Sequence, residues 1–202
     1  MGNIMVAVLA VPGYAESLGK KVTSTDITLY DAKKDQDTVT FVEPTRYPER
    51  LAPLFYTVSL ANKAIVVVDE LNSTFGECVV MLECSRVQSG YIILRNYLSK
   101  EKVEPLIKGT VLEKFVFIDD NPAVLRERLL EEASEKKTNF LTETQSAGTV
   151  PVDHSFNVKG VGTVVLGVVM RARAQGCDAY WLPQPACLPM ANRREDIVIY
   201  KP

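Results

Sequence analysis

Residues 13–21, Gly-Tyr-Ala-Glu-Ser-Leu-Gly-Lys-Lys, carry two glycines and two lysines at a spacing close to that of a phosphate-binding loop. Such a loop, G-x-x-x-x-G-K-[S/T], uses its glycines to let backbone amides surround the phosphates, its lysine to reach the outer phosphates, and its hydroxyl to hold Mg²⁺. Here the spacing is one residue too long, Glu16 brings a negative charge into the cradle, and Lys21 replaces the hydroxyl. The pattern favours an exposed amphipathic helix with solvated lysines over a distorted phosphate site.

Two acidic pairs, Asp69-Glu70 and Asp119-Asp120, follow predicted strands, where α/β folds place their ligands. They suggest a divalent metal site, but Asp120 fits more simply as the cap of a helix that opens at Asn121-Pro122. The single histidine lies in Asp153-His154-Ser155. Neighbours on a strand point to opposite faces, so these three side chains cannot form a compact catalytic triad. The sequence therefore predicts no metal ligand and no catalytic residue.

The chain of 202 residues has a formal net charge of −2, so no global basic field points to nucleic acid. The first residues lack the basic region and long apolar core of a signal peptide, and no run approaches the ~20 apolar residues of a membrane span. The four cysteines show no CxxC spacing. We expect a cytoplasmic protein with free thiols, and we expect Cys78 and Cys84 to be buried in a helix.

Apolar runs alternate with amphipathic segments through the first two thirds of the chain. The expected strands are 4–11, 26–30, 38–42, 64–68, 91–94 and 115–118, with 26–30 at an edge and a charged turn over 31–37. The expected helices are 14–21, 48–62, 75–87, 99–108 and 121–135. Strands that alternate with helices imply an α/β fold with an open, mostly parallel sheet and helices on both faces.

The remaining residues change in character. Residues 136–148 are polar and predict a linker, which sets expected units of 1–137 and 149–202 on either side of a linker over 138–148. Residues 150–167 contain two β-branched runs around Lys159-Gly160-Val161-Gly162, a pattern typical of a β-hairpin.

This hairpin resembles the one that opens the second domain, a β-barrel, of translational GTPases of the elongation factor Tu type. The selenocysteine-specific and initiation-factor branches are the most similar, and Leu60–Asp69 resembles the ADGAILVVD strand of the same family. The resemblance spans residues 4–170 and implies a P-loop-NTPase-like sheet followed by a partial β-barrel. Fewer residues remain here than the family's barrel has, and the tail after Met170 departs from the barrel pattern. The chain is most similar to archaeal members whose G domain lacks the usual motifs.

Three nucleotide-binding landmarks of that family are altered here. Besides the loop after the first strand, the D-T-P-G-H motif is replaced: Glu43 takes the acidic position, while Arg46 and Tyr47 stand where Gly and His belong. At the guanine-reading N-K-x-D position Asn96 remains near register, but Tyr97 replaces Lys and no Asp follows. A resemblance without these contacts implies a G domain that no longer hydrolyses GTP, in a protein that acts by binding in the translation apparatus.

Two alternatives remain open. In an active but divergent GTPase with GTP and Mg²⁺ as cofactors, the nucleotide contacts would be Gly13, Gly19, Lys20, Glu43 and Asn96. In an α/β domain unrelated to translation, the strand ends at Asp69 and Asp119 would hold a small molecule. The resemblance implies tRNA, the ribosome or other translation factors as partners and no membrane. Lys159, in the hairpin turn, is the candidate contact to an RNA phosphate.

Overall fold

The computed structural model describes residues 3–85, 87–135, 152–159, 162–167, 177–181, 184–188 and 196–198. The chain divides into two compact units, 1–137 and 138–202, and each is described by itself. The assignment of the linker and of the second domain lies largely outside the described residues and stays a prediction.

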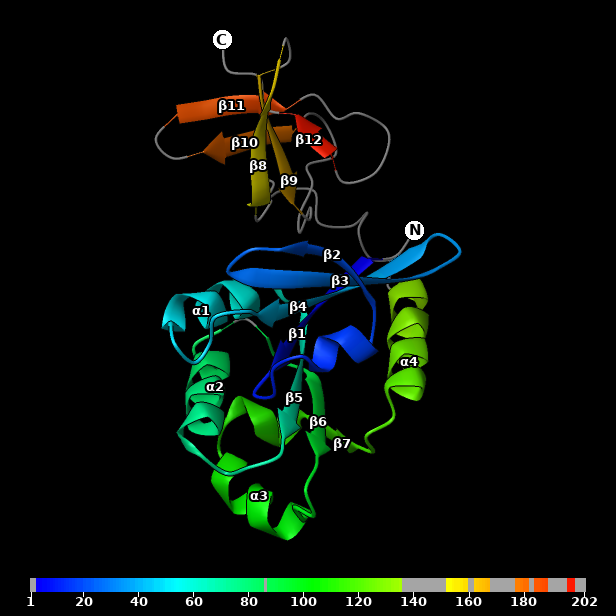
Figure 1. Ribbon diagram of the computed structural model, residues 1–202, viewed down its shortest axis with the longest axis vertical. Coiled ribbons are helices and arrows are strands. Elements are labelled where there is room, and N and C mark those ends of the chain that lie inside the picture. Colours follow the sequence, from blue (N-terminus) through cyan, green and yellow to red (C-terminus); the bar gives the residue numbers. More distant parts are fainter. Residues whose placement is uncertain are drawn as a thin grey trace. The chain divides into compact units, whose positions relative to one another are not determined.

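The first unit contains a seven-stranded sheet with helices on both faces (Figure 1). Its strands are β1 (Asn3–Leu9), β2 (Lys20–Ser24), β3 (Ile27–Lys34), β4 (Asp37–Pro44), β5 (Lys63–Val68), β6 (Gly90–Leu94) and β7 (Val116–Ile118). Its helices are α1 (Leu51–Leu60), α2 (Ser73–Glu83), α3 (Lys100–Ile107), α4 (Pro122–Glu135) and the short 3₁₀ helices η1 (Tyr14–Ser17) and η2 (Val111–Lys114). The strand order is β2-β3-β4-β1-β5-β6-β7, so the predicted α/β class is confirmed.

Five neighbouring strands, from β4 to β7, run parallel, and this follows from their composition. Parallel strands that are covered on both faces read as continuous apolar runs, as β1 and β5 do. Alternate residues of β1 enter different cores: Ala7 and Leu9 pack with α1, α2 and α3, whereas Val6 and Val8 pack with η1 and α4. The prediction of β1 as a buried central strand is confirmed.

Three sequence predictions were wrong at the other side of the sheet. The segment 26–30 is not an edge strand, because β3 lies between β2 and β4, both antiparallel to it. The charged stretch 31–37 is not a turn: β3 continues to Lys34, and Asp31 is held inside the strand because its carboxylate accepts a hydrogen bond from the Thr40 hydroxyl at 2.8 Å. The helix expected over 14–21 is only η1, and the lysines that follow it begin the edge strand β2.

The cysteine prediction was right for one side chain and wrong for the other. Cys78 on α2 is a buried free thiol, but Cys84 follows the end of that helix and is exposed. Among the residues that the structure describes, no helix combines the length and the apolar character needed to cross a lipid bilayer.

In the second unit, β8 (Val152–Val158) and β9 (Gly162–Gly167) pair antiparallel and confirm the predicted hairpin. A third strand, β12 (Asp196–Val198), joins β9, so the order is β12-β9-β8. Two further strands, β10 (Cys177–Trp181) and β11 (Gln184–Leu188), form an antiparallel pair that the sequence did not predict. The assignment of these strands to a barrel stays a prediction.

Candidate functional site

The loop after β1 is built so that backbone N–H groups face one direction. Ala10 has φ +78° and Gly13 has φ +82°, and left-handed backbone at these two positions turns the chain from β1 into η1. For a residue with a Cβ such as Ala10, this conformation is uncommon and clusters at functional sites. The loop therefore resembles the junction of strand and helix at which proteins bind phosphate groups through backbone amides.

In this structure the anion at those amides is a side chain of the protein itself. Glu43, from the end of β4, accepts a hydrogen bond from the Gly13 N–H with 2.6 Å between nitrogen and oxygen. The backbone amides of Tyr14 and Ala15 also hydrogen-bond this carboxylate. Because β4 is the parallel neighbour of β1, the end of β4 lies beside the loop and brings Glu43 to it.

The Glu43 carboxylate is buried, with only 6 % of the residue exposed. Burial raises its pKa above the ordinary range, and the three backbone amides offset part of that rise. The nearby charge of Glu16 adds to the rise. No ion pair found between residues of 3–85 and 87–135 includes Glu43. A carboxylate held by amides alone is the arrangement expected where a protein group takes the place of a bound anion.

Gly19 and Lys20 do not join this cradle. In the register of the sheet, Lys20 on β2 lies opposite Asp31 on β3, and Asp31 lies opposite Thr40 on β4. The β2 residue that lies level with Glu43 is Ser24. The Lys20 side chain is exposed. Gly19 is needed for a different reason: a Cβ there would lie 2.9 Å from the backbone oxygen of Asp31, so a larger residue would push β2 away from β3. The part of these residues in nucleotide binding stays a prediction.

The residue just before the position expected to read guanine forms an ion pair. Arg95, just after β6, pairs with Asp120 at 3.2 Å, and the other oxygen of Asp120 accepts a hydrogen bond from the Tyr14 hydroxyl at 2.7 Å. Burial, and then the hydrogen bond to Asp120, raise the pKa of Tyr14. Asn96 is exposed with φ +51°, beside the fully exposed Tyr97. Asp120 thus ties η1 to the end of β6.

Asp120 does not cap α4 as predicted. The cap is Asn121, whose side-chain oxygen accepts a hydrogen bond from the Val124 amide at 3.3 Å. Among residues 3–85 and 87–135, no group of three metal-binding side chains is close enough together to hold an ion, so the acidic strand ends at Asp69 and Asp119 form no such group.

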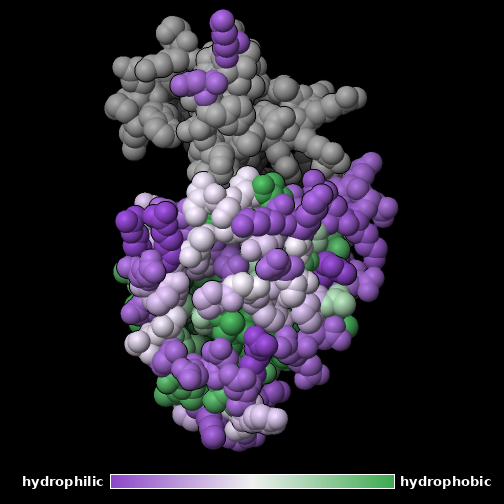
Figure 2. Space-filling view, viewed as in Figure 1, coloured by the Kyte–Doolittle hydropathy of each residue, from purple (hydrophilic) through white to green (hydrophobic). Residues whose placement is uncertain are grey.

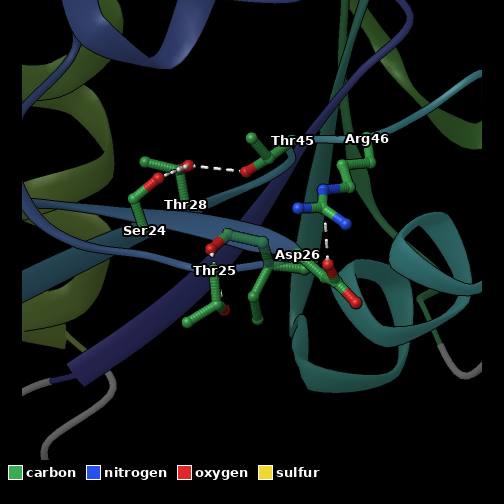
Figure 3. A network of polar contacts seen from close by, with 7 residues as sticks. Ser24, Thr25, Asp26, Thr28, Thr45 and Arg46 are labelled. Carbon is green, nitrogen blue, oxygen red and sulfur yellow. Dashed lines mark hydrogen bonds and ion pairs between the residues drawn. The ribbon is translucent and has the colours of Figure 1, made fainter.

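The segment that connects β4 to α1 lies in a network of polar contacts (Figure 3). The Thr45 hydroxyl lies 2.6 Å from that of Thr28, which lies 3.0 Å from that of Ser24. The side chain of Arg46 pairs with Asp26 at 3.7 Å, and in Figure 3 the two side chains point toward each other across the end of the sheet. The segment after Glu43 is thus fixed to β3 and to the turn between β2 and β3.

Tyr47 is a residue whose contacts the sequence did not reveal. Its ring is buried, and its hydroxyl lies 3.0 Å from both the Thr74 carbonyl and the Glu77 carboxylate of α2. The Cys78 thiol donates to the same hydroxyl at 3.9 Å. Burial raises the pKa of Cys78 to about 11, so this thiol stays protonated and able to donate. The sequence pointed to Tyr47 only through its place at the His position of the related motif, immediately before the helix predicted over 48–62.

A separate apolar groove of about 430 Å³ lies between α1 and α2, away from the loop after β1. Its lining includes Leu51, Val80 and Met81, and Val80 is largely exposed. Figure 2 shows apolar side chains gathered in patches on a surface that is otherwise mostly polar. Lys159 is exposed after β8, and its contact with an RNA phosphate stays a prediction.

Comparison with known proteins supports the architecture. No family model matches the chain. An uncharacterized protein of Methanocaldococcus jannaschii is 35 % identical over 159 residues, which is 79 % of this chain and 50 % of that protein. The chain therefore spans about half the length of this relative.

Solved structures of translation elongation factors share the fold. SelB from Methanococcus maripaludis in complex with the GTP analogue GppNHp matches with a TM-score of 0.67 and 17 % identity, over 98 % of this chain and 51 % of SelB. The α/β unit has the fold of these elongation factors. The bacterial selenocysteine-specific elongation factor EF-Sec matches with a TM-score of 0.62 and 16 % identity, over 98 % of this chain and 42 % of EF-Sec. At these identities the likeness establishes the fold alone.

Proposed function

We propose that this chain is a translation-factor-like protein whose G-domain-like unit neither holds nor hydrolyses GTP, and that it acts by binding in the translation apparatus. The observation that carries the proposal is the Glu43 carboxylate on the amides of the loop after β1. In a phosphate-binding loop the same kind of amides face the phosphates. Here they already have an anionic partner of the protein's own.

A nucleotide would have to displace that partner against two costs. The amides of Gly13, Tyr14 and Ala15 would exchange one anion for another with little net gain. The displaced Glu43 would remain close to the incoming phosphates, and two negative charges at short range repel each other strongly in a partly desolvated site. Asp69-Glu70 and Asp119 follow β5 and β7 and add negative charge at the same edge of the parallel sheet.

The side of the site where a base would be read supports the same proposal. Arg95 is the basic residue at the end of β6, and it is paired with Asp120. Tyr14 donates to the same carboxylate, so Asp120 is engaged by two protein groups. A guanine base needs a free acceptor for its ring and amino N–H groups. Asp120 could accept from them only by giving up its bonds to Arg95 and Tyr14.

The proposal is tested by titrating the chain with fluorescent GTP and GDP in the presence of Mg²⁺. We expect no saturable binding at up to millimolar nucleotide, and no GTP hydrolysis above buffer. Micromolar, Mg²⁺-dependent binding would contradict the proposal and favour the active GTPase. In that case Lys20→Ala should abolish hydrolysis, whereas Lys102→Ala, the same change at an exposed residue of α3, should not.

The binding part of the proposal is tested separately, by co-sedimentation with ribosomes and by filter binding of tRNA. We expect Lys159→Ala to weaken the retained complex and to reduce its salt dependence, because one phosphate contact is lost. Lys102→Ala removes the same charge from the first unit and should leave binding unchanged. Absence of any association with ribosomes or tRNA would remove the translation role while leaving the nucleotide result intact.

A further inference from the structure

Residues 43–47, here called the connector, leave β4 and lead into α1, and four of the five are bonded to four different parts of the first unit. Glu43 is held by the loop after β1, and Thr45 by the hydroxyl of Thr28 on β3. The Thr45 amide also donates to the Asp26 carbonyl at 2.9 Å, and Arg46 pairs with the Asp26 carboxylate. Tyr47 is bonded to α2.

The contacts of Tyr47 reach beyond α2. The Cys78 thiol that donates to its hydroxyl also hydrogen-bonds the backbone of Ala10, which stands in left-handed conformation at the end of β1. The connector thus grips the loop after β1 at two points, through Glu43 at Gly13 and through Tyr47 and Cys78 at Ala10. At its other end the Arg50 amide donates to the Arg46 carbonyl at 2.9 Å and leads directly into α1.

We propose that the connector is a built-in lock, which holds the loop after β1 and the start of α1 in one arrangement without any ligand. A switch needs an element with two arrangements of similar free energy, between which a ligand chooses. A segment with bonds to η1, β3, α2 and the β2–β3 turn would lose several of them together in any second arrangement. The fold therefore carries α1 as a fixed element.

The lock does not depend on the proposed function, because it describes the free protein with no nucleotide present. Its test is amide hydrogen exchange measured by NMR on the full chain in nucleotide-free buffer. We expect the amides of Thr45 and Arg50 to exchange about a hundredfold or more slowly than that of Gln36, in the exposed turn between β3 and β4. Equal exchange at these positions would overturn the lock.

Tyr47→Phe removes only the hydroxyl and leaves the ring buried. We expect it to accelerate exchange at Thr45 and Arg50 by about tenfold, as the loss of one buried hydrogen bond implies. Tyr56→Phe makes the same change on α1, where the tyrosine is half exposed, and should change nothing. The amide of Arg95, bonded to the Val68 carbonyl in the sheet, reports on global opening. Acceleration at Arg95 equal to that at Thr45 would show general destabilisation and contradict a local lock.

A second pair of variants keeps the proposal testable if Tyr47→Phe folds poorly. Glu43→Gln retains an acceptor oxygen but removes the charge, and Glu49→Gln makes the same change at an exposed position six residues later. We expect faster exchange at Thr45 in the first variant and wild-type exchange in the second. If neither variant moves the exchange of the connector, the contact between Glu43 and the loop does not hold it and the lock is wrong.

Discussion

Two carboxylates in the first unit, one buried and one partly buried, have pKa values that are shifted in opposite directions. Glu43, at the end of β4, is held by three backbone amides and has a raised pKa. Glu132, on α4, is contacted by Lys63 at the start of β5 and by the hydroxyl of Tyr91 on β6. Burial acts to raise its pKa too, but the bonds to Lys63 and Tyr91 and the charges of Lys63 and Arg128 more than offset it, so its pKa is lowered.

The difference lies in the partners and not in the burial. Structural carboxylates in protein interiors are paired with cations, as Glu132 is with Lys63. Glu43 is held by backbone amides, which are also the donors that contact the phosphates in a phosphate loop. We infer that Glu132 stabilises the fold as an ordinary ion pair, whereas Glu43 completes a site that would otherwise need an external anion. The predictions below separate these two roles.

The largest effect is expected where the ion pair is broken. Lys63→Met keeps the aliphatic stem but leaves Glu132 without its cation, and side-chain exposures of 15 % and 23 % mean that water screens the pair only in part. We expect a loss of about 2–3 kcal/mol in the free energy of unfolding, at the low end for a broken buried pair. Urea denaturation followed by circular dichroism measures it.

The matched control for this variant is Lys34→Met, because Lys34 also pairs with a glutamate of α4, Glu127, at 3.1 Å. Both partners of this second pair are more than half exposed, at 53 % and 65 %. Exposed pairs contribute little, so we expect a change within about 0.5 kcal/mol. Equal losses in the two variants would show that burial does not distinguish the pairs.

The next effect is expected at the loop after β1. Glu43→Ala leaves the amides of Gly13, Tyr14 and Ala15 without their acceptor, and we expect a loss of about 2 kcal/mol in the free energy of unfolding. Glu49→Ala, at an exposed residue between β4 and α1, should have almost no effect. If added inorganic phosphate restores the stability of Glu43→Ala but not of wild type, Glu43 acts in place of an external anion. No loss in Glu43→Ala would contradict that role.

The parallel strands were predictable because both of their faces are buried, so nearly all of their residues are apolar. The short, β-branched apolar runs of β1, β5 and β6 favour buried strands, and Pro122 marks the start of α4. Strand β2 was missed because an edge strand has no such uniform environment. Four of its five residues are exposed and two are lysines, which fit a solvated helix equally well.

Two residues of the candidate site, Gly13 and Glu43, could be singled out from the sequence, but their contact could not. The resemblance put Glu43 at the acidic position of the D-T-P-G-H motif and Gly13 at the start of a distorted phosphate loop, and the structure brings these two residues into contact. The bond between them joins a side chain to a backbone amide 30 residues away, and a backbone amide leaves no signal in the sequence. For the same reason the contacts of Tyr47 with the Thr74 carbonyl and of Cys78 with Ala10 were not predictable.

The two carboxylates also predict opposite pH dependences. The raised pKa of Glu43 means that the folded state binds its proton more tightly, so its contribution to stability falls as the pH rises from 4.5, the unfolded value, through the raised folded pKa. The lowered pKa of Glu132 gives a contribution that is complete above 4.5 and is lost as the pH falls through the folded pKa.

Glu43→Gln and Glu132→Gln should therefore change the slope of stability against pH in opposite directions. We expect Glu43→Gln to gain stability relative to wild type as the pH rises from 4.5 through the raised pKa of Glu43. We expect Glu132→Gln to lose stability relative to wild type as the pH rises through the lowered pKa of Glu132 toward 4.5. Because glutamine retains an acceptor oxygen, Glu43→Gln should cost less stability than Glu43→Ala. Denaturation curves across this range measure both slopes. Slopes of the same sign would show that the two environments do not differ as their partners imply.

The smallest effect concerns a buried polar group that is bonded neither to a charged side chain, as Glu132 is, nor to backbone amides, as Glu43 is. The Thr57 hydroxyl, on the inner face of α1, is buried and has no hydrogen-bond partner among the described residues. Thr57→Val replaces it with a methyl group of nearly the same shape, and we expect a gain of up to about 1 kcal/mol. The contrast is Thr110→Val, because the Thr110 hydroxyl donates to the Ile107 carbonyl and accepts from the Leu112 amide at the start of η2. That variant should lose about 1 kcal/mol through the missing cap. A loss in Thr57→Val would mean that its hydroxyl has a partner in solution, and α1 would then be held at a further point beside the connector.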